Sequence, residues 1–206
     1  MVVQHNLTAM NSNRMLGITA GTQAKSTEKL SSGYKINRAA DDAAGLAISE
    51  KMRRQVRGLT QASANAQDGI SAVQTAEGAL AEVHDMLQRI NELAVKAAND
   101  TNQSTDRDYI QSEIDALVEE IDRVQSTTTF NEQSLLDGSF SGKKLQVGSE
   151  KDQVIAISIG SMDASTLGVD SLDVSSHDGA KNAIDSVKTA LETVSAQRSD
   201  LGAVQN

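Results

Sequence analysis

Apolar residues recur with helical spacing along most of the chain, most regularly between residues 43 and 98. Every seventh position there is apolar, which defines the heptad series Met52, Leu59, Ala66, Val73, Leu80, Leu87 and Ala94. A companion position lies four residues later at first and three residues later farther along. The pattern predicts one helix, about 80 Å long, that packs against other helices and changes the neighbour it faces. Gly58, Gly69 and Gly78 weaken this helix locally or let another helix approach closely.

A second helix is predicted at about residues 105–128. Its apolar positions alternate four and three apart, at Ile110, Ile114, Leu117, Ile121 and Val124. The turn-forming sequence NDTNQSTD precedes it at residues 99–106, and so short a connection favours an antiparallel pair with the long helix. We expect Thr105 and Asp108 to form a capping box at its start.

The segment after residue 130 changes character before helical spacing returns. Apolar residues alternate with smaller or polar ones on either side of the turn-rich GSEKDQ, which predicts a β-hairpin at about residues 140–160. A last helix is predicted at about residues 177–206, capped by Ser175 and Asp178. Its seam is Ala180, Ile184, Val187, Leu191, Val194, Arg198 and Leu201. The fold class is therefore mainly α: an elongated antiparallel bundle of long helices with a small β-hairpin region.

The first forty residues differ from the rest because their larger apolar residues are sparse and their composition is rich in Ser, Thr and Asn. Gly17 and Gly21 each weaken a helix by about 1 kcal/mol relative to alanine. Alone, this arm should be disordered or marginally helical, and it should become a helix when a partner covers its thin apolar stripe. Asp41 and Asp42 offer an N-cap for the long helix. We therefore expect an arm at residues 1–42 and a rod-like domain at residues 43–206.

Composition and charge narrow the function. The chain is 38% hydrophobic but 2% aromatic and contains no Pro, Trp or Cys, which favours extended helical seams and excludes disulfides and thiolate metal sites. Residues 1–60 hold nine Lys and Arg against four Asp and Glu, a charge of +5, and the remainder holds −14 of the total −9. A basic arm can bind nucleic acid. We do not expect that here, because Tyr34 is its only stacking residue.

Membrane and catalytic signals are also lacking in the sequence. No stretch approaches the roughly 20 apolar residues of a membrane span, and the first residues do not resemble a signal peptide. His5, His84 and His177 have no metal-ligand spacing, and no nucleophile or phosphate-loop motif occurs. We therefore expect no enzyme, metal or cofactor. A basic patch has two open interpretations, a solvated face or a contact with acidic surfaces of neighbouring subunits: Lys51, Arg53, Arg54 and Arg57.

Several long motifs closely resemble bacterial flagellins. LSSGYKINRAADDAAGLAISEKMRRQVRGLTQASANAQDGISAVQTAEGAL at residues 30–80 resembles the amino-terminal signature of that family. INELAVKAAND (90–100), IDRVQSTTTFNEQSLLDG (121–138) and SAQRSDLGAVQN (195–206) follow in family order. The resemblance implies a structural subunit that self-assembles with other flagellin subunits into the extracellular flagellar filament. The arm then corresponds to half of the filament's inner domain, and residues 43–206 correspond to the rod-like core domain.

The chain departs from the family pattern in two ways. Variable outer domains, which many flagellins have between the hairpin and the last helix, are absent, since LGVDSLDV leads almost directly into that helix. The carboxy-terminal continuation is also absent after Asn206, which we interpret as a truncation. We expect the arm to lack its intramolecular partner and the chain alone to polymerise poorly.

The resemblance implies two further partners. One is the flagellar type III export apparatus, which exports flagellins unfolded and without a signal peptide. The other is a vertebrate flagellin-sensing Toll-like receptor, whose contact motif matches LQRINELA, with a further contact in QSEIDAL. The implied receptor-binding residues are Gln88, Arg89, Glu92, Leu93 and Glu113. Leu93 lies beside the heptad series, so we expect its side chain to be available at the surface.

Three other functions are compatible with parts of this pattern. A protein of the hook–filament junction would share the helical core and the export route. The cytoplasmic rod of a signalling receptor would explain the heptads, but the hairpin and the missing membrane span argue against it. An enzyme comes last, because no catalytic constellation is present.

Overall fold

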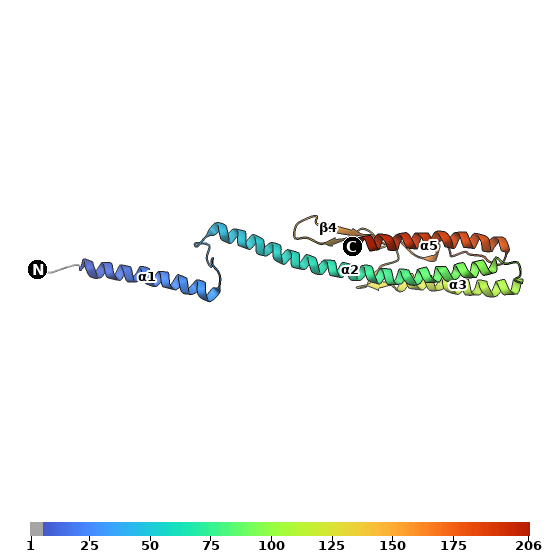
Figure 1. Cartoon of the computed structure of the whole chain (residues 1–206), viewed down its shortest axis with the longest axis horizontal. Helices are drawn as coiled ribbons and strands as arrows, with labels where there is room; N and C mark the ends of the chain where they lie inside the picture. The colour runs from blue at the N-terminus through green and yellow to red at the C-terminus, as the bar shows by residue number, and fades with distance from the viewer. Residues whose placement is uncertain (1–5) are drawn as a thin grey trace. The chain divides into compact units, whose positions relative to one another are not determined.

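The computed structural model describes residues 6–206, so His5 and the first five positions of the predicted arm lie outside the described residues. The chain forms two compact units, which divide at Arg57/Gly58 inside a long helix (Figure 1). The elements are α1 (Leu7–Ser32), α2 (Ala43–Ala97), α3 (Ser104–Thr127), β1 (Thr129–Phe130), β2 (Gln133–Ser134), β3 (Lys143–Gln146), β4 (Val154–Ile157), α4 (Ala164–Leu167) and α5 (His177–Gln205). This mainly α architecture with short antiparallel strands confirms the predicted fold class. No helix among residues 6–206 has the length and apolarity to cross a membrane.

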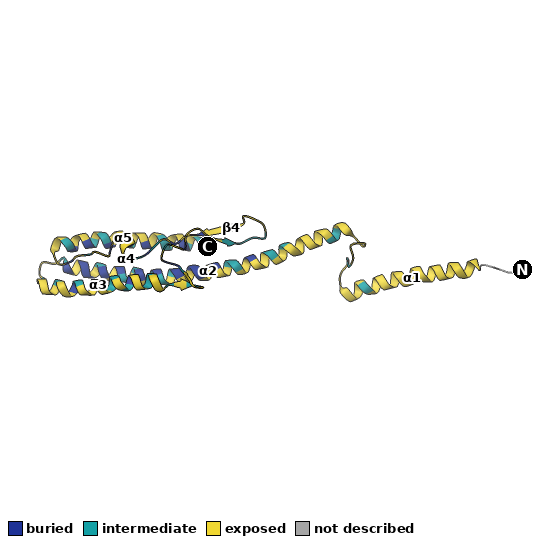
Figure 2. Cartoon of the chain, turned by 180° about the vertical axis from the view of Figure 1, so that it is seen from behind, coloured by how far each residue is buried: buried dark blue, intermediate teal, exposed yellow. Residues whose placement is uncertain are grey.

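The first unit contains α1 and the start of α2. No described residue of α1 is buried, and Figure 2 shows the helix exposed along almost all of its length. α1 is nonetheless a regular helix, although a partner was expected to be necessary. Its backbone ends are satisfied locally: Ala9 N–H donates to Asn6 Oδ1 at 3.2 Å, and the chain leaves through Gly33 at φ +72°.

The connection from α1 into α2 is held by its two aspartates. Asp41 Oδ2 accepts hydrogen bonds from the backbone N–H groups of Asn37 and Arg38 at 3.3 and 3.2 Å. Asp42 Oδ1 accepts from Gly45 N–H at 2.9 Å, which confirms the N-cap expected at this position. One of the orphan donors at the start of α2, Gly45 N–H, therefore has a partner close by in the sequence.

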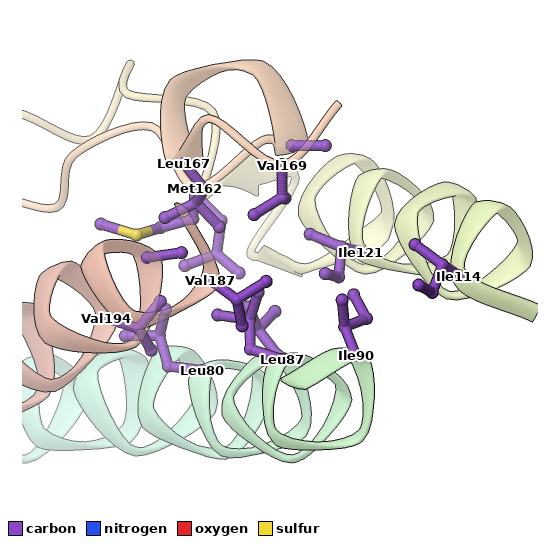
Figure 3. Packing of buried hydrophobic residues seen from close by; sticks show 14 of the residues in the cluster. Leu80, Leu87, Ile90, Ile114, Ile121, Met162, Leu167, Val169, Val187 and Val194 are labelled. Carbon is purple, nitrogen blue, oxygen red and sulfur yellow. The ribbon is translucent and has the colours of Figure 1, made fainter. Parts of the chain in front are cut away.

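The second unit is a helical bundle in which α2, α3 and α5 lie side by side (Figures 1 and 2). α5 starts beside the end of α2, where His177 Nδ1 lies 2.7 Å from Ala98 O, and it runs back antiparallel to α2. Figure 3 shows side chains from α2, α3, α5 and the segment around α4 converging on one core. Its largest fully buried members include Leu80, Leu87, Ile90, Ile114, Ile121 and Leu201.

The heptad series changes environment along α2, as the shifted companion position indicated. Met52 and Leu59 are 60% and 55% exposed, whereas Leu80 and Leu87 are fully buried. The companion positions follow the same division: Val56 is exposed, and those from Ala76 onward are buried. Burial of the heptad series begins at Val73, near the end of α5, so the switch in pattern marks the point at which α2 enters the helical bundle. The β3–β4 segment contacts α2 slightly earlier, where Asn65 Nδ2 donates to Gln146 O at 3.0 Å.

Both capping predictions were misplaced by one or two residues. α3 begins at Ser104, and the box joins Gln103 to Asp106, with Gln103 N–H donating to Asp106 Oδ2 at 3.1 Å. The cap of α5 is Ser176, whose Oγ accepts from Gly179 N–H at 3.0 Å. Runs of Ser, Thr and Asp offer several equivalent caps, so the spacing rule alone does not select among them.

The predicted hairpin is confirmed, with β3 and β4 antiparallel and Leu145 opposite Ile155. It packs against α2 at Gly69, where an added Cβ would collide with Leu145 Cδ1. This glycine therefore admits a strand side chain and not a second helix. The small β1–β2 hairpin and α4 were not predicted, since both are too short to show periodicity.

Candidate functional site

An ion-pair cluster joins the exposed faces of α2 and α3. Arg89 Nε and Nη2 donate to Glu113 Oε1 at 3.0 and 2.7 Å, and Nη1 donates to Glu92 Oε2 at 3.1 Å. The hydrogen bond with Glu113, followed by that with Glu92, raises the pKa of Arg89 above its ordinary value. The cluster therefore brings together three of the residues proposed from the sequence, although Glu113 is 24 positions away from Arg89.

The turn between α2 and α3 fixes the register of this cluster. Arg107 Nε donates to Ala97 O at 3.0 Å, and Asn102 Nδ2 donates to Lys96 O at 2.5 Å. With His177 at Ala98 O, these side chains bind carbonyl groups at the end of α2, where the helix no longer supplies its regular backbone donors. The antiparallel helices are thereby held so that Arg89 and Glu113 face each other.

Gln88 belongs to a neighbouring polar pair on the same helix. Its Nε2 lies 2.8 Å from His84 Nε2, one helical turn earlier. His84 Nδ1 is buried without a hydrogen-bond partner among the described residues. The contact between His84 and Gln88 was not predicted from the sequence. The four-residue spacing was the available signal.

Leu93 requires a correction. Its side chain was expected at the surface, but it is 2% exposed and belongs to the core. The reason is that α2 has a neighbour on each side, so its buried arc is wider than a single seam. Leu93 therefore lies one turn from Arg89 as part of the packing beneath the cluster. It is not positioned to fill a pocket on a partner.

A second candidate surface is the exposed stretch of α1 and α2 in the first unit. Arg53 in the predicted basic patch is already engaged, with Glu50 at 2.9 Å and over the Tyr34 ring at 5.9 Å. Apolar side chains elsewhere in this stretch stay in water, which is typical of helices that bind a partner. The exposed apolar residues are Leu7, Met10, Met15, Leu16, Ile18, Leu30, Ile48, Met52 and Val56.

Sequence comparisons identify relatives across the whole chain. A family model described as the bacterial flagellin N-terminal helical region matches residues 3–141. A flagellin of Halalkalibacterium halodurans is 51% identical over 208 residues, covering 100% of this chain and 76% of the relative. A flagellin of Bacillus subtilis is 45% identical, covering 100% of this chain and 79% of the relative.

Solved structures agree in fold. The structure of Bacillus cereus flagellin is 27% identical, with a TM-score of 0.60 over 68% of this chain and 82% of that one. FliC from Burkholderia pseudomallei is 20% identical, with a TM-score of 0.63 over 67% of this chain and 99% of that one. At that identity, the second likeness concerns the fold alone.

Proposed function

The chain belongs to the bacterial flagellin family, and on that premise we propose that it is a structural subunit of the flagellar filament. Flagellins are a structural family and not an enzyme family. The observation that best supports assembly is the exposed apolar stretch of α1 and α2, since helices with such a face gain stability by burying it against a partner.

Addition to existing filaments tests the filament proposal. Labelled chain is mixed with filament seeds of the Halalkalibacterium halodurans flagellin, and binding to seed ends is followed by electron microscopy. We expect saturable end binding, or competition with elongation by that flagellin. Met52→Glu with Val56→Glu should abolish the binding, because it places charges where apolar contact is needed. Gln67→Glu with Gln74→Glu is the matched control at exposed polar positions of α2. If the unmodified chain did not bind the seed ends, the proposal would be contradicted.

The filament is extracellular, so its subunits must leave the cell. We propose the flagellar type III export apparatus as the route. A first unit without buried residues in α1 supports this, because little tertiary packing must be undone before the chain is threaded out. Cells lacking the export apparatus should retain the chain, and secretion at an unchanged level would contradict this route.

We also propose that a vertebrate flagellin-sensing Toll-like receptor binds the ion-pair cluster, through Arg89, Glu92, Glu113 and Gln88. The support is chemical: an exposed arginine in a network of charge-assisted bonds is a common binding hot spot. Leu93 has a different role in this proposal, because its burial makes it a support for the cluster and not a contact.

Receptor affinity and unfolding free energy should separate these roles. Arg89→Ala should weaken binding by about tenfold or more while leaving the fold intact. Arg123→Ala is the matched control, since Arg123 is an exposed arginine that also pairs with a glutamate, Glu120, on α3. Leu93→Ala should instead lower the unfolding free energy by about 2–5 kcal/mol. Unchanged affinity of Arg89→Ala would show that the receptor does not use this cluster.

A further inference from the structure

An apolar groove lies where the two small hairpins meet α2 in the second unit. Its volume is about 280 Å³, and its walls include Gly69, Phe130, Phe140 and Leu145. Phe130 and Phe140 are the only phenylalanines of the chain. Such a surface stays unfavourably hydrated unless an apolar group fills it.

The rim of this groove is charged. Lys143 Nζ lies 5.7 Å from the centroid of the Phe140 ring, and the exposed Lys144 follows it on β3. Asp68 on α2 is the carboxylate that lines the same groove. An occupant that fits would therefore combine an aromatic ring, a hydroxyl donor for Asp68 and acidic neighbours for the lysines.

Tyr109 has these properties. It is 73% exposed on the second turn of α3, and its side chain makes no hydrogen bond or ring contact within residues 6–206. Tyr34, the other tyrosine, already contacts Arg53. Asp108 directly precedes Tyr109 in the sequence and Asp106 lies three positions before it, and both aspartates are exposed. An aromatic side chain held in water beside carboxylates matches the groove in shape and charge.

Tyr109 and the groove lie at opposite ends of α3, because Tyr109 is near Ser104 and Phe130 follows Thr127. At 1.5 Å per residue they are about 30 Å apart along the helix, so Tyr109 does not reach the groove of its own chain. We propose that Tyr109 of one copy inserts into the Phe130/Phe140 groove of the next, with its hydroxyl donating to Asp68 and Lys144 facing Asp108. This contact rests on the filament function proposed above and assigns one of its interfaces.

Size and symmetry support a second copy as the occupant. A cavity of roughly 150 Å³ is enough to bind benzene, so the groove has room for one phenol ring. Tyr109 and the groove are different surfaces of the same chain. A copy that has inserted its Tyr109 into a neighbour therefore still has its own groove open for another copy. A contact of this heterologous kind propagates as an open chain instead of closing into a dimer.

Cysteine cross-linking tests the contact directly, because the chain has no cysteine of its own. Ser112→Cys, one turn from Tyr109, and Gln133→Cys, at the groove, are introduced into separate chains. We expect the mixture to form a disulfide-linked heterodimer under mild oxidation, in concentrated solution and on filament seeds. Thr189→Cys on the exposed face of α5 replaces Ser112→Cys in the control mixture, which should stay unlinked.

Substitutions of Tyr109 and of the charged residues Lys144 and Asp108 distinguish this contact from non-specific association of the chains. Tyr109→Ala should lower the cross-linking yield by about tenfold or more, and Tyr109→Phe by about threefold, since only the hydroxyl is lost. Lys144→Glu and Asp108→Lys should each lower the yield, and their combination in both chains should restore it. If either residue only stabilised the fold of its own chain, the combined variant would not recover the cross-linking yield.

The outcomes separate this contact from the filament function. Seed addition without the specific heterodimer would overturn the contact and leave the filament function standing. A heterodimer without seed addition would support the contact and count against the filament. A heterodimer that survives Tyr109→Ala would also overturn the contact, and a yield equal to that of the Thr189→Cys control would assign the groove to another occupant.

Discussion

The two units use the same helical spacing but differ in what covers it. In the first unit, Leu16 and Met52 are 67% and 60% exposed, and α1 buries nothing. In the second unit, Leu80 and Leu87 are fully buried. The basic charge also belongs to the first sixty residues and the acidic charge to the remainder. Periodicity therefore predicts a helix, whereas burial depends on whether the same chain supplies a neighbour for its apolar face.

This difference assigns stability and assembly to separate parts of the molecule. Apolar burial stabilises the second unit, at about 25 cal/mol per Å² removed from water. The first unit depends on its caps and on side chains that remain to be covered. A subunit of a polymer needs both: a core that folds alone and surfaces that gain their burial only on assembly.

The largest effect should come from truncating matched leucines in the two units. Leu80→Ala opens a cavity in a fully packed site and should lower the unfolding free energy by about 2–5 kcal/mol. Leu16→Ala should change it by about 0.5 kcal/mol or less, because the side chain is 67% exposed. Urea denaturation followed by circular dichroism measures both. Equal losses would mean that the first unit is packed as tightly as the second.

Glycines of α2 offer a comparison with opposite signs. At Gly69 a new Cβ would collide with Leu145, so Gly69→Ala should displace the β3–β4 hairpin and cost about 1–3 kcal/mol. At Gly78 nothing lies within 4 Å, so Gly78→Ala should stabilise the chain by up to about 1 kcal/mol. Thermal unfolding of the two variants gives the signs. Stabilisation by both would place the hairpin away from α2.

The sequence predicted the parts of the fold that repeat. The heptad series located α2, and the four-and-three spacing located α3 and α5 to within a residue. Two kinds of feature were not predicted: helix caps, which depend on which of several similar residues caps the helix, and short strands, which depend on tertiary contacts. The N-cap of α5 is Ser176 and not Ser175, and β1 and β2 are too short to show an alternating apolar pattern.

The candidate site was predicted in part for the same reason. Arg89 and Glu113 were named together from a family resemblance, and their ion pair is present in the structure. The burial of Leu93 was not predicted because the heptad series indicates one neighbour of α2, whereas α3 and α5 both pack against it. The groove for Tyr109 is formed by segments far apart in the chain, so no local pattern indicates it.

A smaller effect is expected in the turn between β1 and β2. Asn131 and Glu132 both have positive φ, at 49° and 63°, as a two-residue hairpin turn requires. Glu132→Gly should therefore gain about 0.5–1 kcal/mol, because glycine accepts this conformation without strain. Asn131→Gly should gain less, since asparagine tolerates the left-handed region better. A loss of stability in Glu132→Gly, measured by thermal unfolding, would indicate that the Glu132 side chain has a stabilising contact.

The smallest effect should be the response to acid, which again separates the units. Ser161 Oγ and Ser165 Oγ each donate to the Asp163 carboxylate at 2.6 Å, and these hydrogen bonds hold its pKa well below the ordinary value. Because the pKa of Asp163 is lowered in the folded state, the stabilisation is present above about pH 4 and is lost as pH falls through the folded value.

The pKa of Asp41 is lowered too, by the backbone N–H groups of Arg38 and then Asn37. Its loss should open only the connection between α1 and α2, because the first unit has no packed core to transmit the change. Asp163→Asn should therefore flatten the acid limb of urea unfolding, whereas Asp41→Asn should change only hydrogen exchange near residue 38. An acid limb that depends equally on both aspartates would mean that the two units unfold together.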